Sequence, residues 1–184
     1  MLYQIVSFLL EVVASLLCTA FLLRLYMQWQ RISFNNPVGT LVFALSDWAV
    51  LPLRRVLPAL GRLDSASLVA AALVELLHYL LLWLLLGANT NPVWVLWLAL
   101  CGLVRLALTG MVGLLIVYVV MSWVQARSPI ADVIQRLAEP LLRPLRRVLP
   151  QLGGLDLSAL VLLVLLQVAL MVLGHVQASV LFGA

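Results

Sequence analysis

The chain has 184 residues, of which 65% are hydrophobic and only 10% are charged, and all 11 of its basic residues are arginine. A soluble domain of this length must cover much of its surface with charged side chains, so this composition excludes that class and favours an integral membrane protein. The formal net charge of +4 does not indicate nucleic acid, because the arginines gather in two small clusters beside apolar stretches. We expect anionic phospholipid head groups as their partner and no nucleic acid.

Four apolar stretches are long enough to cross about 30 Å of hydrocarbon as helices. They are predicted at about residues 2–26, 66–86, 93–124 and 157–180. The third is longer than one crossing requires, so it is either tilted or begins as a separate short segment before Gly102.

The segments between spans one and two and between spans three and four, at about 37–57 and 129–149, are predicted to be amphipathic helices. In the second segment one apolar stripe recurs at helical spacing: Ile130, Val133, Ile134, Leu137, Leu141, Leu145 and Val148. Charged residues occupy the opposite face, so we expect this helix to lie in the membrane interface. Pro140 and Pro144 each remove a backbone donor, which predicts a kink or a break into two pieces.

The sequence also repeats itself at an offset of 92 positions. Residues 51–68 and 143–160 share 12 of 18 residues, including the heptapeptide Pro-Leu-Arg-Arg-Val-Leu-Pro. We therefore expect two tandem repeats, 1–91 and 92–184. The predicted fold class is an all-α integral membrane protein with four transmembrane helices in two same-orientation repeats, each with an interfacial amphipathic helix between its two spans.

Ten of the 11 arginines border the segments between spans one and two or between spans three and four. The positive-inside rule places both segments in the cytoplasm and both termini in the periplasm. The paired arginines admit two interpretations. They bind anionic lipid or an acidic partner, or they only fix the topology. The candidate binding residues are Arg54, Arg55, Arg136, Arg143, Arg146 and Arg147.

Three residues are predicted to cap helices: Asp64 and Asp156 before spans two and four, and Ser128 before the second amphipathic helix. Inside the spans, Glu75 lies near the bilayer midplane and its repeat counterpart is Gln167. A carboxylate at that depth is costly unless it is neutral, paired or facing water. Two interpretations stay open: proton or ion handling, and the favoured one, a hydrogen bond between Glu75 and Gln167.

Glu11 and Arg105 fall at nearly equal depth, so they either form an ion pair or each snorkels separately to the interface. His78 follows Glu75 by one helical turn, and a second histidine, His175, lies near the outer end of span four. Two histidines on opposite sides of a bundle are able to ligate haem, but their unequal repeat positions favour local hydrogen bonds instead. We therefore expect no cofactor.

The second half carries a run of residues that resembles the YggT family of small bacterial integral membrane proteins. The run is Ser122-Trp123, Ser128-Pro129-Ile130, Glu139-Pro140, Arg143-Pro144, Arg147, Pro150, Gly153-Gly154, Asp156 and Ser158. The first half matches in degenerate form, with Asp47-Trp48 in place of the Glu-Pro step and Arg62 in place of the second glycine. Ala159 stands where the family pattern has proline.

The resemblance implies a bacterial inner-membrane protein with no established catalytic reaction. Family members are connected with osmotic stress, with cell division or nucleoid placement and, in chloroplasts, with assembly of a b-type cytochrome. The sequence itself has no catalytic or metal-binding constellation. We therefore expect a non-enzymatic protein that organises or assembles membrane components, with an unknown membrane protein partner. The alternative is an oligomeric channel or transporter for osmotic adaptation.

Overall fold

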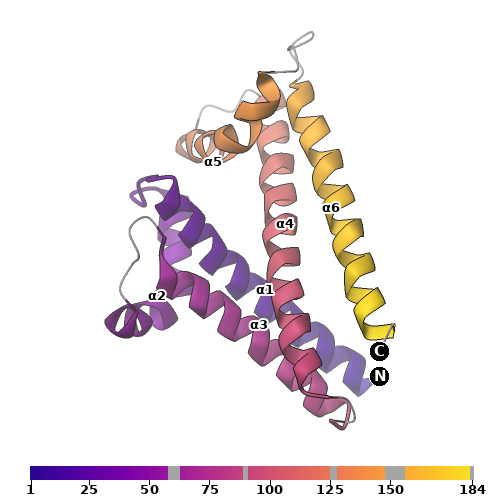
Figure 1. Cartoon of the computed structure of the whole chain (residues 1–184). Helices are drawn as coiled ribbons and strands as arrows, with labels where there is room; N and C mark the ends of the chain where they lie inside the picture. Colours follow the sequence, from indigo (N-terminus) through magenta and orange to yellow (C-terminus); the bar gives the residue numbers. More distant parts are fainter. Residues whose placement is uncertain (58–62, 89–90, 125–127, 148–155, 183–184) are drawn as a thin grey trace.

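The computed structural model describes residues 1–57, 63–88, 91–124, 128–147 and 156–182. Within these ranges the chain forms six α-helices (Figure 1). In chain order they are α1 (Leu2–Trp29), α2 (Pro37–Val56), α3 (Ser65–Leu85), α4 (Val93–Val124), α5 (Pro129–Arg146) and α6 (Leu157–Phe182).

Four of these helices, α1, α3, α4 and α6, are long and apolar enough to cross a membrane. They coincide with the four predicted spans to within a few residues, so this part of the prediction is confirmed. The long third span is one continuous helix and not two segments. Many large apolar side chains on these helices point outward, as hydrocarbon-facing residues of a multi-pass membrane protein do.

The four spans pack in the order α1–α3–α4–α6, and α4 is the helix that joins the two halves of the chain. Small residues allow α1 and α3 to approach closely, because Cys18 packs beside Ala66, Ala70 and Ala71. In the second half Leu115 lies in a core cluster that α4, α5 and α6 share.

The two shorter helices, α2 and α5, begin 92 positions apart at Pro37 and Pro129. Each is capped by the residue before its proline: Asn36 accepts a hydrogen bond from the amide of Gly39, and Ser128 accepts one from Ala131. Figure 1 shows α2 and α5 towards one end of the bundle and both chain termini towards the other.

Of the kink or break predicted for the second amphipathic segment, the break is wrong, because α5 runs continuously through Pro140 and Pro144. Its buried residues, Val133, Leu137, Ala138 and Leu142, pack on the protein's own helices. Packing of this face supplies free energy that offsets the backbone hydrogen bonds lost at the prolines. The predicted stripe member Val148 lies outside the described residues.

Gly39 allows the chain before α2 to fold back tightly onto the helix. A Cβ atom at this position would lie 2.2 Å from the carbonyl oxygen of Phe34 and 2.6 Å from its Cα. Backbone atoms cannot rotate away as the tip of a side chain does, so only glycine fits.

We predict that Gly39→Ala lowers the stability of the protein by about 1–3 kcal/mol or more, the usual cost of overpacking. The matched control is Gly174→Ala on α6, where an added Cβ meets nothing within 4 Å. Thermal unfolding of both variants in detergent measures the difference. Equal midpoints for the two variants would contradict the prediction.

Candidate functional site

Three of the four spans contribute to polar clusters that lie where α2 and α5 meet the bundle. The first cluster is centred on Arg24, a residue of α1 that is only 2% exposed. Its Nη1 donates hydrogen bonds of 2.6 Å to Ser46 Oγ and to Asp47 Oδ1. Its guanidinium also lies 4.8 Å from the centre of the Phe43 ring. Arg24 therefore ties α1 to α2.

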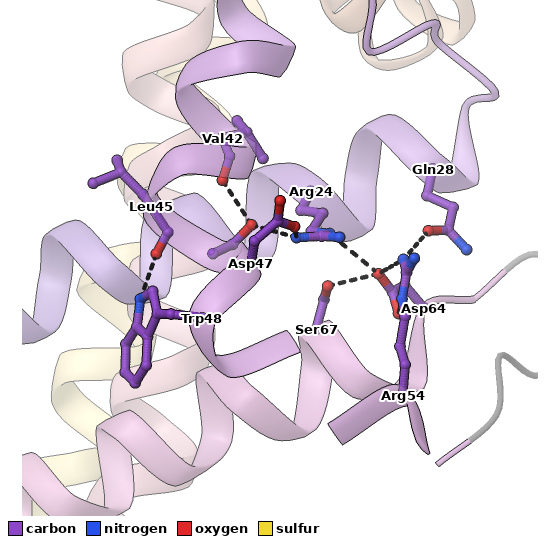
Figure 2. Close-up of polar contacts among 10 residues, drawn as sticks. Arg24, Gln28, Val42, Leu45, Asp47, Trp48, Arg54, Asp64 and Ser67 are labelled. Atoms are coloured by element: carbon purple, nitrogen blue, oxygen red, sulfur yellow. Dashed lines mark hydrogen bonds and ion pairs between the residues drawn. The ribbon is translucent and has the colours of Figure 1, made fainter. Parts of the chain in front are cut away.

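The carboxylate of Asp64 is the second centre of the same cluster, and it is fully buried. Arg54, in the last turn of α2, donates from Nη2 at 2.5 Å and from Nε at 3.3 Å. Ser67 donates its hydroxyl at 2.7 Å, and Arg24 Nε lies 3.7 Å away. Figure 2 shows Arg24 and Arg54 converging on this one carboxylate.

These contacts set the charge state of Asp64. Burial by itself would raise the pKa of Asp64, but hydrogen bonds from Arg54 and Ser67, together with the charge of Arg54, lower it below its ordinary value. The first cluster is therefore a structural ion-pair network with an ionised Asp64.

The second cluster repeats this arrangement in the other half of the chain. Arg146, in the last turn of α5, donates from Nη2 to Asp156 Oδ2 at 2.5 Å and from Nη1 to Glu139 Oε2 at 2.6 Å. The hydroxyl of Tyr118 on α4 lies 2.6 Å from the same Arg146 Nη2. Burial would raise the pKa of Asp156, but the hydrogen bond and charge of Arg146 outweigh this effect and lower the pKa.

The two halves differ in how the neighbouring carboxylate is used. Arg54 and Arg146 are equivalent at the 92 offset, and so are Asp47 and Glu139. Glu139 pairs with Arg146 of its own helix, whereas Asp47 pairs with Arg24 of α1. Position 116, the counterpart of Arg24, is isoleucine, so the second half has no equivalent of this buried arginine.

The tyrosines equivalent at this offset also diverge. Tyr118 contacts Arg146 and Asp156, but Tyr26 donates its hydroxyl hydrogen bond to the backbone oxygen of Leu137 at 2.9 Å. That bond connects α1 of the first half to α5 of the second half.

The structure divides the six arginines predicted to bind lipid or a partner into two groups. Arg54 and Arg146 are held in internal ion pairs. The other four are exposed, and none forms an ion pair with a described residue: Arg55, Arg136, Arg143 and Arg147. Whether those four bind lipid stays a prediction.

Arg136, Arg143 and Arg147 share one face of α5, because spacings of seven and eleven residues return to the same side of a helix. Arg147 follows the last residue of α5 with helical backbone angles and so continues this face. We call these three residues the basic stripe. Arg146 is held in internal ion pairs, so the exposed positive charge of α5 comes from the basic stripe.

The predicted caps of Ser128 and Asp156 are confirmed, because each side chain accepts a hydrogen bond from an amide in the first turn of its helix. Asp64 occupies the N-cap position of α3, but Arg54 and Ser67 are its main partners. Sequence reasoning missed Arg24. The available signal was a charged residue near the end of an apolar span, which requires a partner at that depth.

The polar residues inside the spans are arranged differently from the prediction. Glu75 is buried, but Gln167 is exposed on α6, so the expected hydrogen bond between them is wrong. The neighbours of Glu75 are Cys18, whose Sγ lies 3.7 Å from Oε2, and His78, whose Nδ1 lies 4.0 Å from Oε1. This polar group belongs to the interface of α1, α3 and α4.

Glycine at position 102 makes room for this carboxylate, since an added Cβ would lie 2.2 Å from Glu75 Oε1. Glu11 and Arg105 are both described and exposed, and they form no ion pair with each other. His175 is exposed on α6, whereas His78 is buried on α3. Among the described residues no group of three or more metal-ligating side chains converges.

We predict that Asp64→Asn lowers the free energy of unfolding by about 3 kcal/mol, because it removes the buried carboxylate with which Arg54 pairs and leaves Arg24 with Asp47 alone. Asp132→Asn, which changes an exposed carboxylate on α5, is the matched control and should be neutral. Unfolding of the purified protein by chemical denaturant or heat measures both.

The same ion pairs predict acid sensitivity. The pKa values of Asp64 and Asp156 are lowered in the folded protein, so their contribution is complete above the unfolded carboxyl pKa of about 3.9 and is lost as pH falls through the folded value. The thermal midpoint should hold between about pH 7 and 5 and fall below about pH 4. A double Asp64→Asn, Asp156→Asn variant should start lower and fall less steeply, and a parallel fall in both proteins would contradict this account.

Comparison with known proteins places this sequence in a family. The model of the CCB3/YggT family matches residues 3–85 and 97–177. Uncharacterized protein YggT of Escherichia coli strain K12 is 42% identical over 168 residues, covering 88% of this chain and 85% of that protein. An uncharacterized protein encoded in the proC 3' region of Vibrio alginolyticus is 34% identical over 179 residues, covering 96% and 97%. No solved structure matches the chain. The chain belongs to the CCB3/YggT family of membrane proteins.

Proposed function

We propose that this protein is a non-enzymatic component of the bacterial inner membrane that organises or assembles other membrane components through its basic helices. In this proposal the two halves are tandem repeats that cross the bilayer in the same direction. The amphipathic helices α2 and α5 then lie at the cytoplasmic interface, and both termini lie in the periplasm. The asymmetric placement of the arginines supports this orientation.

The observation that carries the proposal is the basic stripe. Its three arginines are exposed, while the nearby carboxylates of Glu139 and Asp156 are occupied by Arg146. The helix therefore presents three exposed arginines against one exposed carboxylate, Asp132, so its outward charge is net positive. Each arginine near an anionic leaflet contributes about 1 kcal/mol of attraction, so three give roughly 3 kcal/mol.

This surface suits a docking role better than a catalytic one. Arginine forms bidentate hydrogen bonds with phosphate and carboxylate groups, so anionic phospholipid and an acidic segment of a partner membrane protein are both compatible ligands. Such a helix recruits or orients other components without chemical change. Family membership is consistent with this role, although the relatives compared above carry no assigned activity in their names.

We predict that a triple Arg136→Gln, Arg143→Gln, Arg147→Gln variant loses most of the preference for phosphatidylglycerol over phosphatidylcholine, by about 10- to 100-fold given some 1 kcal/mol per arginine. Native mass spectrometry of the purified full-length protein, titrated with each lipid, gives the two affinities. The single variants Arg143→Gln and Arg105→Gln form a matched pair, since both remove one exposed arginine and only the first is on the stripe. An unchanged lipid preference in the triple variant would refute the lipid contact.

A second candidate function is the movement of a proton or an ion through an oligomer of this chain. It is favoured by Glu75, which is 3% exposed within a span and lies beside His78, whose two ring nitrogens are buried without a hydrogen-bond partner among the described residues. A buried titratable pair inside a membrane is a common feature of ion pathways.

Flux measurements separate the two functions. We expect purified protein in liposomes to pass protons and potassium no faster than protein-free liposomes. Flux that Glu75→Gln abolishes and Glu11→Gln leaves intact would replace the first proposal with the second. Glu11 is the suitable control because it is an exposed carboxylate in another span.

A further inference from the structure

An apolar cavity of about 520 Å³ lies between the two halves of the molecule. Its walls come from the second half of α1, the middle of α4 and the buried side of α5, which contributes Ile134 and Leu137. This volume is within the range of small-molecule sites in proteins, which is roughly 300–1,000 Å³. The cavity is distinct from both ion-pair clusters.

Two glycines of α4, Gly110 and Gly113, keep the cavity open. A Cβ atom built on either would meet nothing within 4 Å. Their counterparts in the first half of the sequence are Cys18 and Phe21, both buried side chains of the core. The second half therefore has empty space at positions where the first half has packed side chains.

The lining restricts the chemistry of an occupant. Nearly all of the surface is aliphatic or aromatic carbon, which gives a polar solute no hydrogen-bond partners. The walls belong to membrane spans, where the surrounding solvent is hydrocarbon. Trp29, Leu63 and Val117 line the cavity and are 51%, 49% and 43% exposed, so the cavity communicates with the outside of the protein.

One end of the cavity carries the features of a head-group region. Tyr26 and Trp29 belong to the lining, and such amphipathic aromatic residues favour the boundary between hydrocarbon and water. Arg31 follows Trp29 by two residues and is exposed, and α5, whose Ile134 and Leu137 line the cavity, carries the basic stripe on its opposite, exposed face. The hydrogen bond from Tyr26 to Leu137 holds α5 over this end.

We propose that this cavity binds one acyl chain of an anionic phospholipid, whose phosphate lies at the rim of the cavity near Arg31 and within reach of α5, the helix that carries the basic stripe on its exposed face. The charge of the head group complements the exposed arginines, and the acyl chain matches the apolar walls. Binding of the acyl chain in the cavity does not depend on the proposed function. The preference for an anionic head group rests on the proposed function.

Filling the cavity tests the proposal. We expect the double variant Gly110→Leu, Gly113→Leu to bind phosphatidylglycerol at least about tenfold more weakly than the unmodified protein, measured by native mass spectrometry of the full-length chain. Gly174→Leu is the matched control, because this glycine also has open space around it but does not line the cavity. Unchanged binding in a folded double variant would overturn the proposal.

A second measurement needs no variant. Phosphatidylglycerol with a photoactivatable diazirine in the middle of one acyl chain should crosslink the unmodified protein at lining residues such as Thr19 and Leu114, mapped by peptide mass spectrometry. Crosslinks found only on outward-facing residues of α6, which does not line the cavity, would rule out the cavity as the binding site of the acyl chain. Displacement of the probe by an equal concentration of an isoprenoid quinone would assign the cavity to a different occupant and also reject the proposal.

The triple variant of the basic stripe distinguishes acyl-chain binding in the cavity from the proposed function. If it loses the preference for phosphatidylglycerol yet still crosslinks through Leu114, the acyl-chain seat and the proposed function both stand. If the unmodified protein crosslinks there without any preference for an anionic lipid, the proposed lipid contact fails and the acyl-chain seat remains.

Discussion

An arginine in the last turn of a short helix pairs with an aspartate at the start of the next span, and this pair occurs once in each half of the chain. Arg54 meets Asp64, and Arg146 meets Asp156, in both cases with a 2.5 Å contact between Nη2 and Oδ2. The pair fixes the short helix relative to the span that follows it. Removing one partner of a buried pair leaves an uncompensated charge, so the helices α2 and α5 depend on it for their position.

The arginine–aspartate pair has different neighbours in the two halves. In the first half Arg24 enters the cluster from α1 and leaves Asp47 and Asp64 engaged with buried or half-buried arginines. In the second half a single arginine, Arg146, forms ion pairs with both Glu139 and Asp156. The other arginines of α5 are therefore free of internal carboxylates within the described chain, and they form the basic stripe. The first half therefore has the larger buried ion-pair network, and the second carries the basic stripe on its short helix, whereas α2 has one exposed arginine, Arg55.

The polar residues inside the spans also differ between the two halves. Glu75, Cys18 and His78 gather at the interface of α1, α3 and α4, in space that Gly102 leaves open. The corresponding part of the second half contains Gln167, which faces outward from α6. On α4, Gly110 and Gly113 leave an apolar cavity where a close-packed interface would otherwise form. The two halves therefore differ in their interior: the first has a buried polar group near Gly102, and the second contributes Gly110 and Gly113 to a hydrocarbon-lined space.

The sequence by itself determined the four spans, the starts of α2 and α5 and the caps at Ser128 and Asp156, because these features depend on local hydropathy and on backbone groups a few residues away. It did not determine which faces of the helices meet. The predicted hydrogen bond between Glu75 and Gln167 followed from repeat symmetry, but Glu75 is buried beside Cys18 and His78 and Gln167 is exposed on α6. Likewise, the sequence could not separate Arg54 and Arg146 from the other arginines, since their partners lie ten residues further along the chain, beyond the end of the helix. Contacts of this kind depend on helix rotation and crossing, which only tertiary packing decides.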